Sequence, residues 1–135
     1  MRGVRRLGEE ALSQAEEARK AVRKNRPEAE AVYHRMKAYK LLADYYERKV
    51  LATTCALIYG FGGPPGYKAE AERHADEAVA LYEKAITFIG ETIDRKSGAL
   101  KGHWGGKALT LAELIEHEKT ERKELSKVFK WPATP

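Results

Sequence analysis

The stretch PEAEAVYHRMKAYKLLADYYERKVLATTCALIY, residues 27–59, decides the fold. Along it, apolar or small side chains recur in alternating steps of four and three residues, a set that we call the 4-3 seam: Val32, Met36, Tyr39, Ala43, Tyr46, Val50, Thr53 and Leu57. This spacing is that of the a and d positions of packed helices. A second set, the alanine stripe, runs beside it: Ala38, Leu42, Tyr45, Ala52 and Ala56. The pattern predicts one helix of roughly 50 Å, buried along the seam and nearly all round at its C-terminal end, at the centre of a bundle.

Three further helices are predicted around this central one. Residues 4–24 carry an apolar side of mostly small residues, and a turn rich in glycine and proline at 60–66 separates the central helix from a helix over 67–94. That third helix has its apolar side at Ala71, Ala75, Ala78, Tyr82, Ala85, Ile89 and Ile93. Because the connection is short, we expect the second and third helices to pack antiparallel. Residues 95–108 are predicted as a loop, and the last helix, 110–131, begins with a capping box at Thr110 and Glu113. No strand is predicted.

Composition narrows the class of protein. The 135 residues are enough for one domain, and 43% hydrophobic with 33% charged residues is typical of a folded chain. We expect no transmembrane segment and no signal peptide. The single cysteine, Cys55, excludes a disulfide within the chain and a multi-cysteine zinc site. One Asn and one Gln among many Glu, Lys and Arg resemble the balance of thermophile proteins. The prediction is an all-α, antiparallel four-helix bundle, a single domain over residues 1–135.

Three of the predicted helices carry a Glu four residues before a His. The pairs are Glu30 with His34, Glu70 with His74, and Glu113 with His117. Carboxylate–imidazole clusters hold di-metal centres in some bundles, but those centres use Glu-x-x-His spacing. We therefore predict exposed, helix-stabilising pairs, and neither a metal nor a cofactor. On the core face of the last helix, Glu118 and Arg122 are expected to pair with each other.

Three local features resemble sites at first view. Cys55 has no activating base nearby in the sequence, so a buried, inert thiol is expected. The turn at 60–66 lacks the Lys-Ser/Thr ending of a phosphate-binding loop and is interpreted as a connector. Between glycines, His103, Trp104 and Lys107 are candidate ligand-binding residues, because an exposed Trp can stack on a sugar or a base. The favoured alternative is that Trp104 plugs the open end of the bundle. No catalytic residue is predicted.

The basic ends of the chain, which give the net charge of +5, raise a second hypothesis. A nucleic-acid-binding face would use Arg19, Lys20, Arg23, Lys24 and Arg26. Acidic Glu16 and Glu17 share the same helix, so nucleic-acid binding ranks below an interaction with protein.

Two segments, LLADYYERKVLA at 41–52 and ADEAVALYEKAI at 75–86, carry a family resemblance. They are similar to the helical C-terminal regions of large bacterial glycoside-hydrolase-like proteins, in which a Tyr-Tyr-x-x-Lys helix precedes a glycine-containing turn and a second helix. The likeness covers residues 28–94. In those proteins the catalytic carboxylates lie in a separate barrel domain, so the resemblance implies a non-catalytic accessory module. The expected partners are another protein, other domains of a longer chain, or a second copy, because the alanine face of the first helix and the polar middle of the last imply incomplete burial.

Overall fold

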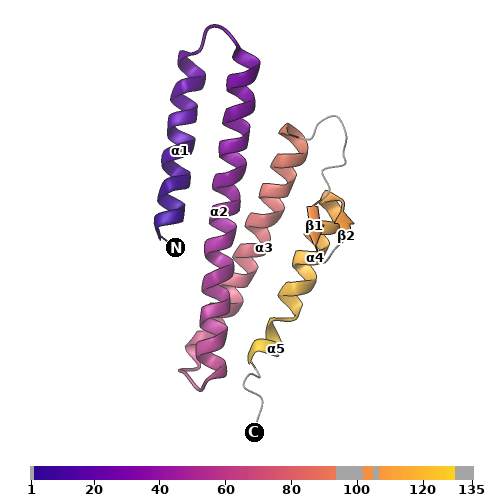
Figure 1. Cartoon of the computed structure of the whole chain (residues 1–135). Helices are drawn as coiled ribbons and strands as arrows, with labels where there is room; N and C mark the ends of the chain where they lie inside the picture. The colour runs from indigo at the N-terminus through magenta and orange to yellow at the C-terminus, as the bar shows by residue number, and fades with distance from the viewer. Residues whose placement is uncertain (1, 94–101, 105–106, 130–135) are drawn as a thin grey trace.

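The computed structural model is an antiparallel helical bundle around one long helix, α2, which confirms the predicted fold class (Figure 1). The structure describes residues 2–93, 102–104 and 107–129. Its elements are α1 (Arg2–Ala21), α2 (Arg26–Gly60), α3 (Gly66–Thr92), β1 (Gly102–Trp104), β2 (Lys107–Leu109), α4 (Leu111–Lys123) and α5 (Leu125–Phe129). α2 packs against α1, α3 and α5, and α4 packs against α3.

The ends of the helices follow from residues with unusual backbone freedom. Asn25, between α1 and α2, has φ of 57° and ψ of 37°, a left-handed conformation that Asn adopts more readily than most residues. α1 stops at Ala21 and not at residue 24 as predicted, so Arg23 and Lys24 lie in the turn. After α2, Gly62 has φ of 89°, and a Cβ on Gly63 would come within 2.6 Å of the Ile58 carbonyl oxygen. The turn into α3 therefore requires glycine.

The core of α2 lies along the alanine stripe and not along the 4-3 seam. The buried residues of α2 are Ala38, Leu41, Ala52 and Ala56. None of the eight seam residues is buried, and Val32, Tyr39, Tyr46 and Thr53 are exposed. The prediction that the seam faces the core was wrong, as was the prediction that α2 is buried all round at its end, where Thr54 and Ile58 are also exposed.

The reason is the close approach of α2 and α3. Ala52 and Ala56 of α2 share one buried cluster with Ala71 and Ala75 of α3. Small side chains let two helix backbones come near each other, whereas Tyr or Met at the same positions would hold them apart. On α3 the predicted apolar side is the core: Ala71, Ala75, Ala78, Ala85 and Ile89 are buried. Ile93, at its end, is 38% exposed.

The C-terminal segment differs from the single helix predicted over 110–131. The capping box is confirmed: the Glu113 N–H donates to Thr110 Oγ1 at 3.2 Å, and the Thr110 N–H donates to the Glu113 carboxylate at 2.7 Å. The helix is interrupted at Glu124, which separates α4 from α5. Directly after this interruption, Leu125 packs in the cluster formed by Ala52, Ala56, Ala71 and Ala75.

A short β-hairpin precedes α4, where the sequence predicted only a loop. β1 and β2 pair antiparallel, with Gly102 opposite Leu109, His103 opposite Ala108, and Trp104 opposite Lys107. The absence of strands from the prediction was therefore wrong at this one place.

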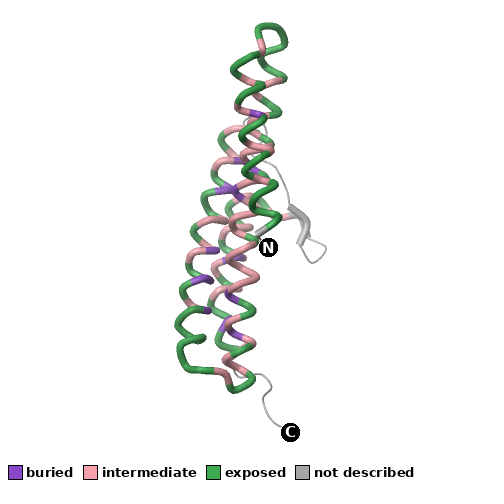
Figure 2. Tube along the Cα trace, turned by 90° about the vertical axis from the view of Figure 1, so that its left-hand side faces the viewer, coloured by how far each residue is buried: buried purple, intermediate pink, exposed green. Residues whose placement is uncertain are grey.

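α1 packs mainly on α2, and together they extend beyond the end of α3 (Figure 1). Figure 2 shows this projecting end as mostly exposed, with some residues of intermediate burial. Among the described side chains of α1, only Ala15 is buried. No helix in the described part of the chain combines the length and the apolar character needed to cross a membrane.

Candidate functional site

A cavity of about 330 Å³ opens where α4 gives way to α5, between α2 and α3. Its apolar lining is Ala52, Ala75, Ala78, Val79, Leu125 and Val128. Its polar lining is Lys49, Thr53, Glu118, Glu121, Arg122, Glu124 and Lys127. The alanines are too small to fill the space between the helices, so the cavity follows from the same residues that let α2 and α3 approach.

Lys49 of α2 bonds to two acidic side chains, Glu118 and Glu121, on the charged side of this cavity. Its Nζ donates to the Glu121 carboxylate at 2.6 Å, to the Tyr45 hydroxyl at 2.8 Å and to Glu118 Oε2 at 3.0 Å. The Tyr45 hydroxyl in turn donates to Glu118 Oε2 at 3.0 Å, and its ring lies 4.7 Å from that of Tyr82. Glu118 is only 7% exposed, and burying a carboxylate is costly unless a cation and hydrogen bonds compensate it. Lys49 and Tyr45 supply that compensation.

Tyr45 and Lys49 both keep their protons near neutral pH, because the pKa of each group is raised. Burial raises the pKa of Tyr45. Burial acts to lower the pKa of Lys49, but its hydrogen bonds to Glu121, Tyr45 and Glu118 outweigh that effect, and the pKa is raised. Near neutral pH the lysine is an ammonium and the tyrosine a phenol, so neither group is suited to accept a proton from a substrate. The network therefore holds α2 and α4 together through the bonds of Lys49 to Glu118 and Glu121.

Arg122 does not pair with Glu118, contrary to the prediction. The Arg122 Nε donates to Asp76 of α3 at 2.7 Å. Although one turn apart on α4, Glu118 reaches α2 and Arg122 reaches α3. Each therefore fixes α4 to a different neighbour.

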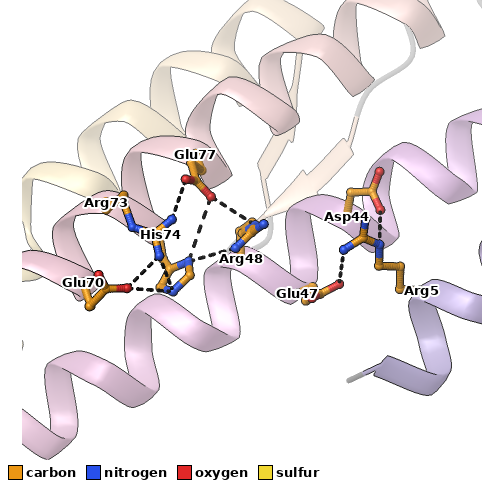
Figure 3. A network of polar contacts seen from close by, with 8 residues as sticks. All are labelled: Arg5, Asp44, Glu47, Arg48, Glu70, Arg73, His74 and Glu77. Atoms are coloured by element: carbon orange, nitrogen blue, oxygen red, sulfur yellow. Dashed lines mark hydrogen bonds and ion pairs between the residues drawn. The ribbon is translucent and has the colours of Figure 1, made fainter. Parts of the chain in front are cut away.

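A second network joins α2 to α3 around His74, which is 7% exposed (Figure 3). Arg48 Nη1 lies 3.2 Å from His74 Nδ1, and Arg48 Nε lies 3.1 Å from Glu77 Oε2. The His74 Nε2 is 3.6 Å from Glu70, whose carboxylate accepts a bond from Arg73 at 2.6 Å. Burial lowers the pKa of His74, and the charges of Arg73 and Arg48 lower it further. The imidazole is therefore neutral near pH 7.

The predicted carboxylate–histidine pairs stand apart from one another. Glu30 lies 3.9 Å from His34 and Glu70 lies 3.6 Å from His74, as the spacing predicts. His74 is buried, however, so its pair is not the exposed one expected. Besides its contact with Glu30, the His34 ring lies 6.0 Å from the ring of Phe88 of α3. Within the part of the chain that the structure describes, no group of three or more His, Cys, Asp or Glu is placed to hold a metal ion.

Cys55 is partly buried beside the alanine cluster. Burial and the charge of Glu70 raise the pKa of its thiol. Since the thiolate is the nucleophile, the raised pKa favours the inert thiol that the sequence predicted.

The ligand-binding candidates His103, Trp104 and Lys107 lie on β1 and β2, with Trp104 and Lys107 in register across the hairpin. Their side chains, and with them the predicted Trp104 plug, fall outside what the structure describes. Figure 1 places the hairpin beside α4, away from the turn between α1 and α2.

The structure gathers the five basic candidates around the turn between α1 and α2. Lys20, Arg23, Lys24 and Arg26 are exposed there. Arg19 is partly buried and engaged, with its Nε 3.6 Å from Glu30 and its guanidinium 3.9 Å from the Tyr33 ring centroid.

Sequence reasoning missed the link between Lys49 and Glu118. The information was present, because Lys49 falls between Tyr45 and Ala52 on the alanine stripe at helical spacing, and Glu118 was placed on the core face of its helix. A cation and an anion on two facing core surfaces are expected to meet. The partner nearest in sequence, Arg122, pairs with Asp76, and Glu118 pairs across the interface with Lys49.

No protein-family model matches this sequence, and neither a curated protein nor a solved structure matches it.

Proposed function

We propose that this chain is a non-catalytic helical module that works by packing against another protein surface. The observation that carries the proposal is the exposed part of the 4-3 seam of α2, where Val32, Tyr39 and Tyr46 are 50%, 63% and 54% exposed. Large apolar side chains at helical spacing on an open face are typical of an interaction site.

The titratable groups described above fit this role. Lys49, Tyr45 and Glu118 bond to one another across α2 and α4, and Arg48 and His74 do so across α2 and α3. Such contacts position helices. Both networks hold α2 on its inner side, away from the exposed Tyr39 and Tyr46.

We further propose, from the resemblance over residues 28–94, that the module is an accessory part of a carbohydrate-active polypeptide. The test is to read the coding sequence on both sides of this segment. An adjoining barrel domain with catalytic carboxylates supports this part of the proposal. Flanking sequence without such a domain rejects it and leaves the interaction role standing.

The interaction role is tested by hydroxyl-radical labelling of tyrosines in cells that make the protein and in dilute purified protein. If a partner covers the seam, Tyr39 and Tyr46 react several-fold less in cells. Tyr67, which is 37% exposed and lies on α3, serves as the internal control. Equal labelling of Tyr39 and Tyr46 in both settings rejects the proposal.

A second candidate function, nucleic-acid binding, is favoured by one observation: exposed Lys20, Arg23, Lys24 and Arg26 gather at the projecting end of α1 and α2 (Figure 1). Fluorescence anisotropy with single-stranded RNA and duplex DNA tests it at about 50 and about 200 mM salt, because phosphate contacts weaken steeply with salt. Binding that a Lys20→Glu/Arg23→Glu variant abolishes supports it. No binding at the lower salt rejects it.

A further inference from the structure

The cavity at the junction of α4 and α5 has the size and the divided wall of a small-molecule site. Its volume of about 330 Å³ lies in the range of about 300–1,000 Å³ that is usual for ligand pockets. Since a water molecule takes about 30 Å³ in the liquid, the space holds roughly ten non-hydrogen atoms. One side of the wall is aliphatic and the other is charged. A ligand that fits both sides has an apolar body and one polar head.

The aliphatic side of the wall comes from three helices. Ala52 belongs to α2, Ala75 and Ala78 belong to α3, and Leu125 and Val128 belong to α5. The alanines end in a single methyl group, so they leave the space between the helices open. An alkyl chain lying along them removes apolar surface from water, which favours binding without any directional bond.

On the charged side, Lys49 has no donor left for a ligand. An ammonium group has three N–H donors. Lys49 directs them to Glu121 at 2.6 Å, to the Tyr45 hydroxyl at 2.8 Å and to Glu118 at 3.0 Å. A ligand carboxylate or phosphate would have to replace one of these bonds.

The other donors on the wall are engaged as well. Arg122 Nε donates to Asp76 at 2.7 Å, and Lys127 Nζ donates to Glu124 at 2.9 Å. The Thr53 hydroxyl donates to a backbone carbonyl of its own helix at 3.1 Å. The polar side of the cavity therefore favours a ligand that donates hydrogen bonds over one that accepts them.

Acceptor capacity remains on the two carboxylates beside Lys49. Glu118 is 7% exposed, and the bonds that it accepts from Tyr45 and Lys49 both end on Oε2. Among the described residues, every buried side-chain oxygen or nitrogen atom has a hydrogen-bond partner. Glu118 Oε1, which accepts no bond from a described residue, therefore keeps contact with solvent, and the cavity that Glu118 lines provides it. Glu121 likewise receives Lys49 on Oε2.

The charges at this corner of the cavity are also unequal. The single ammonium of Lys49 faces the carboxylates of both Glu118 and Glu121. Arg122 and Lys127 are each matched by a separate acidic partner, so one negative charge is in excess beside Lys49. An excess charge next to an apolar wall is unfavourable, and a further cation relieves it.

We propose that this cavity binds a primary alkylammonium ion. The ammonium donates to Oε1 of Glu118 and Oε1 of Glu121, and the alkyl chain lies along the alanines. Two cations then face two carboxylates, and no bond of Lys49 is broken. The inference goes beyond the proposed interaction role, because it uses other residues than the exposed Tyr39 and Tyr46. Either proposal can fail while the other stands.

The head-group preference is tested by isothermal titration calorimetry of the full chain with n-octylamine, n-octanol and n-octanoate, which share one alkyl chain. At neutral pH, n-octylamine is expected to bind about tenfold more tightly than n-octanol, because charge-assisted hydrogen bonds are the stronger ones. n-Octanoate is expected to bind most weakly. An amine that does not bind, or that binds no more tightly than the alcohol or the carboxylate, overturns the proposal.

The position of the head group is tested by Glu121→Gln. This side chain is 34% exposed, and Lys49 keeps Glu118 as its partner, so the far-UV circular dichroism spectrum should not change. The Kd of n-octylamine should rise about tenfold, and that of n-octanol should stay the same. Glu116→Gln, on the exposed face of the same helix, is the matched control and should leave both values unchanged. Equal effects of the two variants on n-octylamine overturn the proposal.

The position of the alkyl chain is tested by Val79→Phe, which adds a ring to the cavity wall. The Kd values of n-octylamine and n-octanol should both rise about tenfold, because the ring takes up space that the chain needs. Val32→Phe, at a half-exposed position of α2 outside the cavity, is the control and should bind both as the wild type does. Unchanged binding by a folded Val79→Phe protein places the ligand elsewhere and overturns the proposal.

Discussion

The two apolar faces of α2 differ in side-chain size and in what covers them. The inner face is rich in alanine and meets the alanines of α3, where Ala56 and Ala71 have no exposed surface at all. The outer face carries Tyr39, Tyr46 and Val32, each at least half exposed. Small residues allow close approach within the chain, whereas larger ones suit a contact between separately folded surfaces. Hydrophobic regularity by itself therefore does not identify the face that becomes the core.

The largest effect on stability is expected at Ala56, on the inner face of α2. We expect Ala56→Leu to lower the free energy of unfolding by about 3 kcal/mol, because the fully buried position offers no room for a larger side chain. Tyr39→Leu on the outer face is the control and should change it by less than about 0.5 kcal/mol in dilute monomer. Urea denaturation measures both. Similar losses at the two positions would contradict the assignment of inner and outer faces.

The next largest effect on stability is expected at Lys49, which lies at the border between the inner and outer faces of α2. Lys49→Met leaves the buried Glu118 carboxylate without its cation while the Tyr45 hydroxyl still donates to it, so we expect a loss of about 2 kcal/mol. Adding Glu118→Leu should recover more than half of that loss, because the unpaired charge is removed. A double variant as unstable as the sum of its two single variants would show that the side chains do not interact.

Asn25 tests how α1 is set against one side of α2. Its left-handed conformation disfavours residues with a Cβ other than Asn and Asp, and we expect Asn25→Ala to cost about 1 kcal/mol in unfolding free energy. Asn25→Gly accepts the same backbone angles and should be close to the wild type. Thermal denaturation followed by circular dichroism distinguishes the two, and an Ala variant as stable as the Gly variant would argue against this turn.

The smallest effect concerns His74, on the inner side of α2. Because the fold lowers its pKa, the unfolded chain takes up a proton first as the pH falls through about 6.5, the ordinary histidine value. Stability is therefore full above that pH and decreases as the pH falls below it. The unfolding free energy of the wild type, measured with urea, should fall with this decrease in pH by less than the loss caused by Asn25→Ala. His74→Gln should fall less, and an identical pH slope in the two proteins would exclude His74 as the cause.

The sequence was sufficient for the elements whose ends depend on local chemistry. The capping box at Thr110 and Glu113 and the glycine turn after α2 lie where the residues indicate. The apolar side of α3 was also recognised, because its alanines and isoleucines face one direction only. Periodicity alone succeeds when a helix has a single apolar face.

The sequence was insufficient where two solutions compete. α2 has two apolar stripes, and only the approach of α3 decides between them. Glu118 had a partner four residues away and another across the interface, and burial favours the one that Tyr45 also supports. The interruption at Glu124 accompanies the packing of Leu125 against α2 and α3. No residue of the segment is a typical helix-ending residue, so the sequence does not predict this interruption. The short hairpin at β1 and β2 lacks the alternating apolar pattern by which strands are usually recognised.

Among the described side chains of α1, Ala15 is the one that is buried against its neighbour, and it is still 8% exposed. The free energy that keeps α1 docked is therefore a small part of the total, and α1 should open as one cooperative unit far more often than the pair formed by α2 and α3. Its amides are then expected to exchange with solvent long before those of the inner helices. Such an opening would expose the side of α2 that carries Lys40 and Ala43, against which Gly8 of α1 packs in the structure.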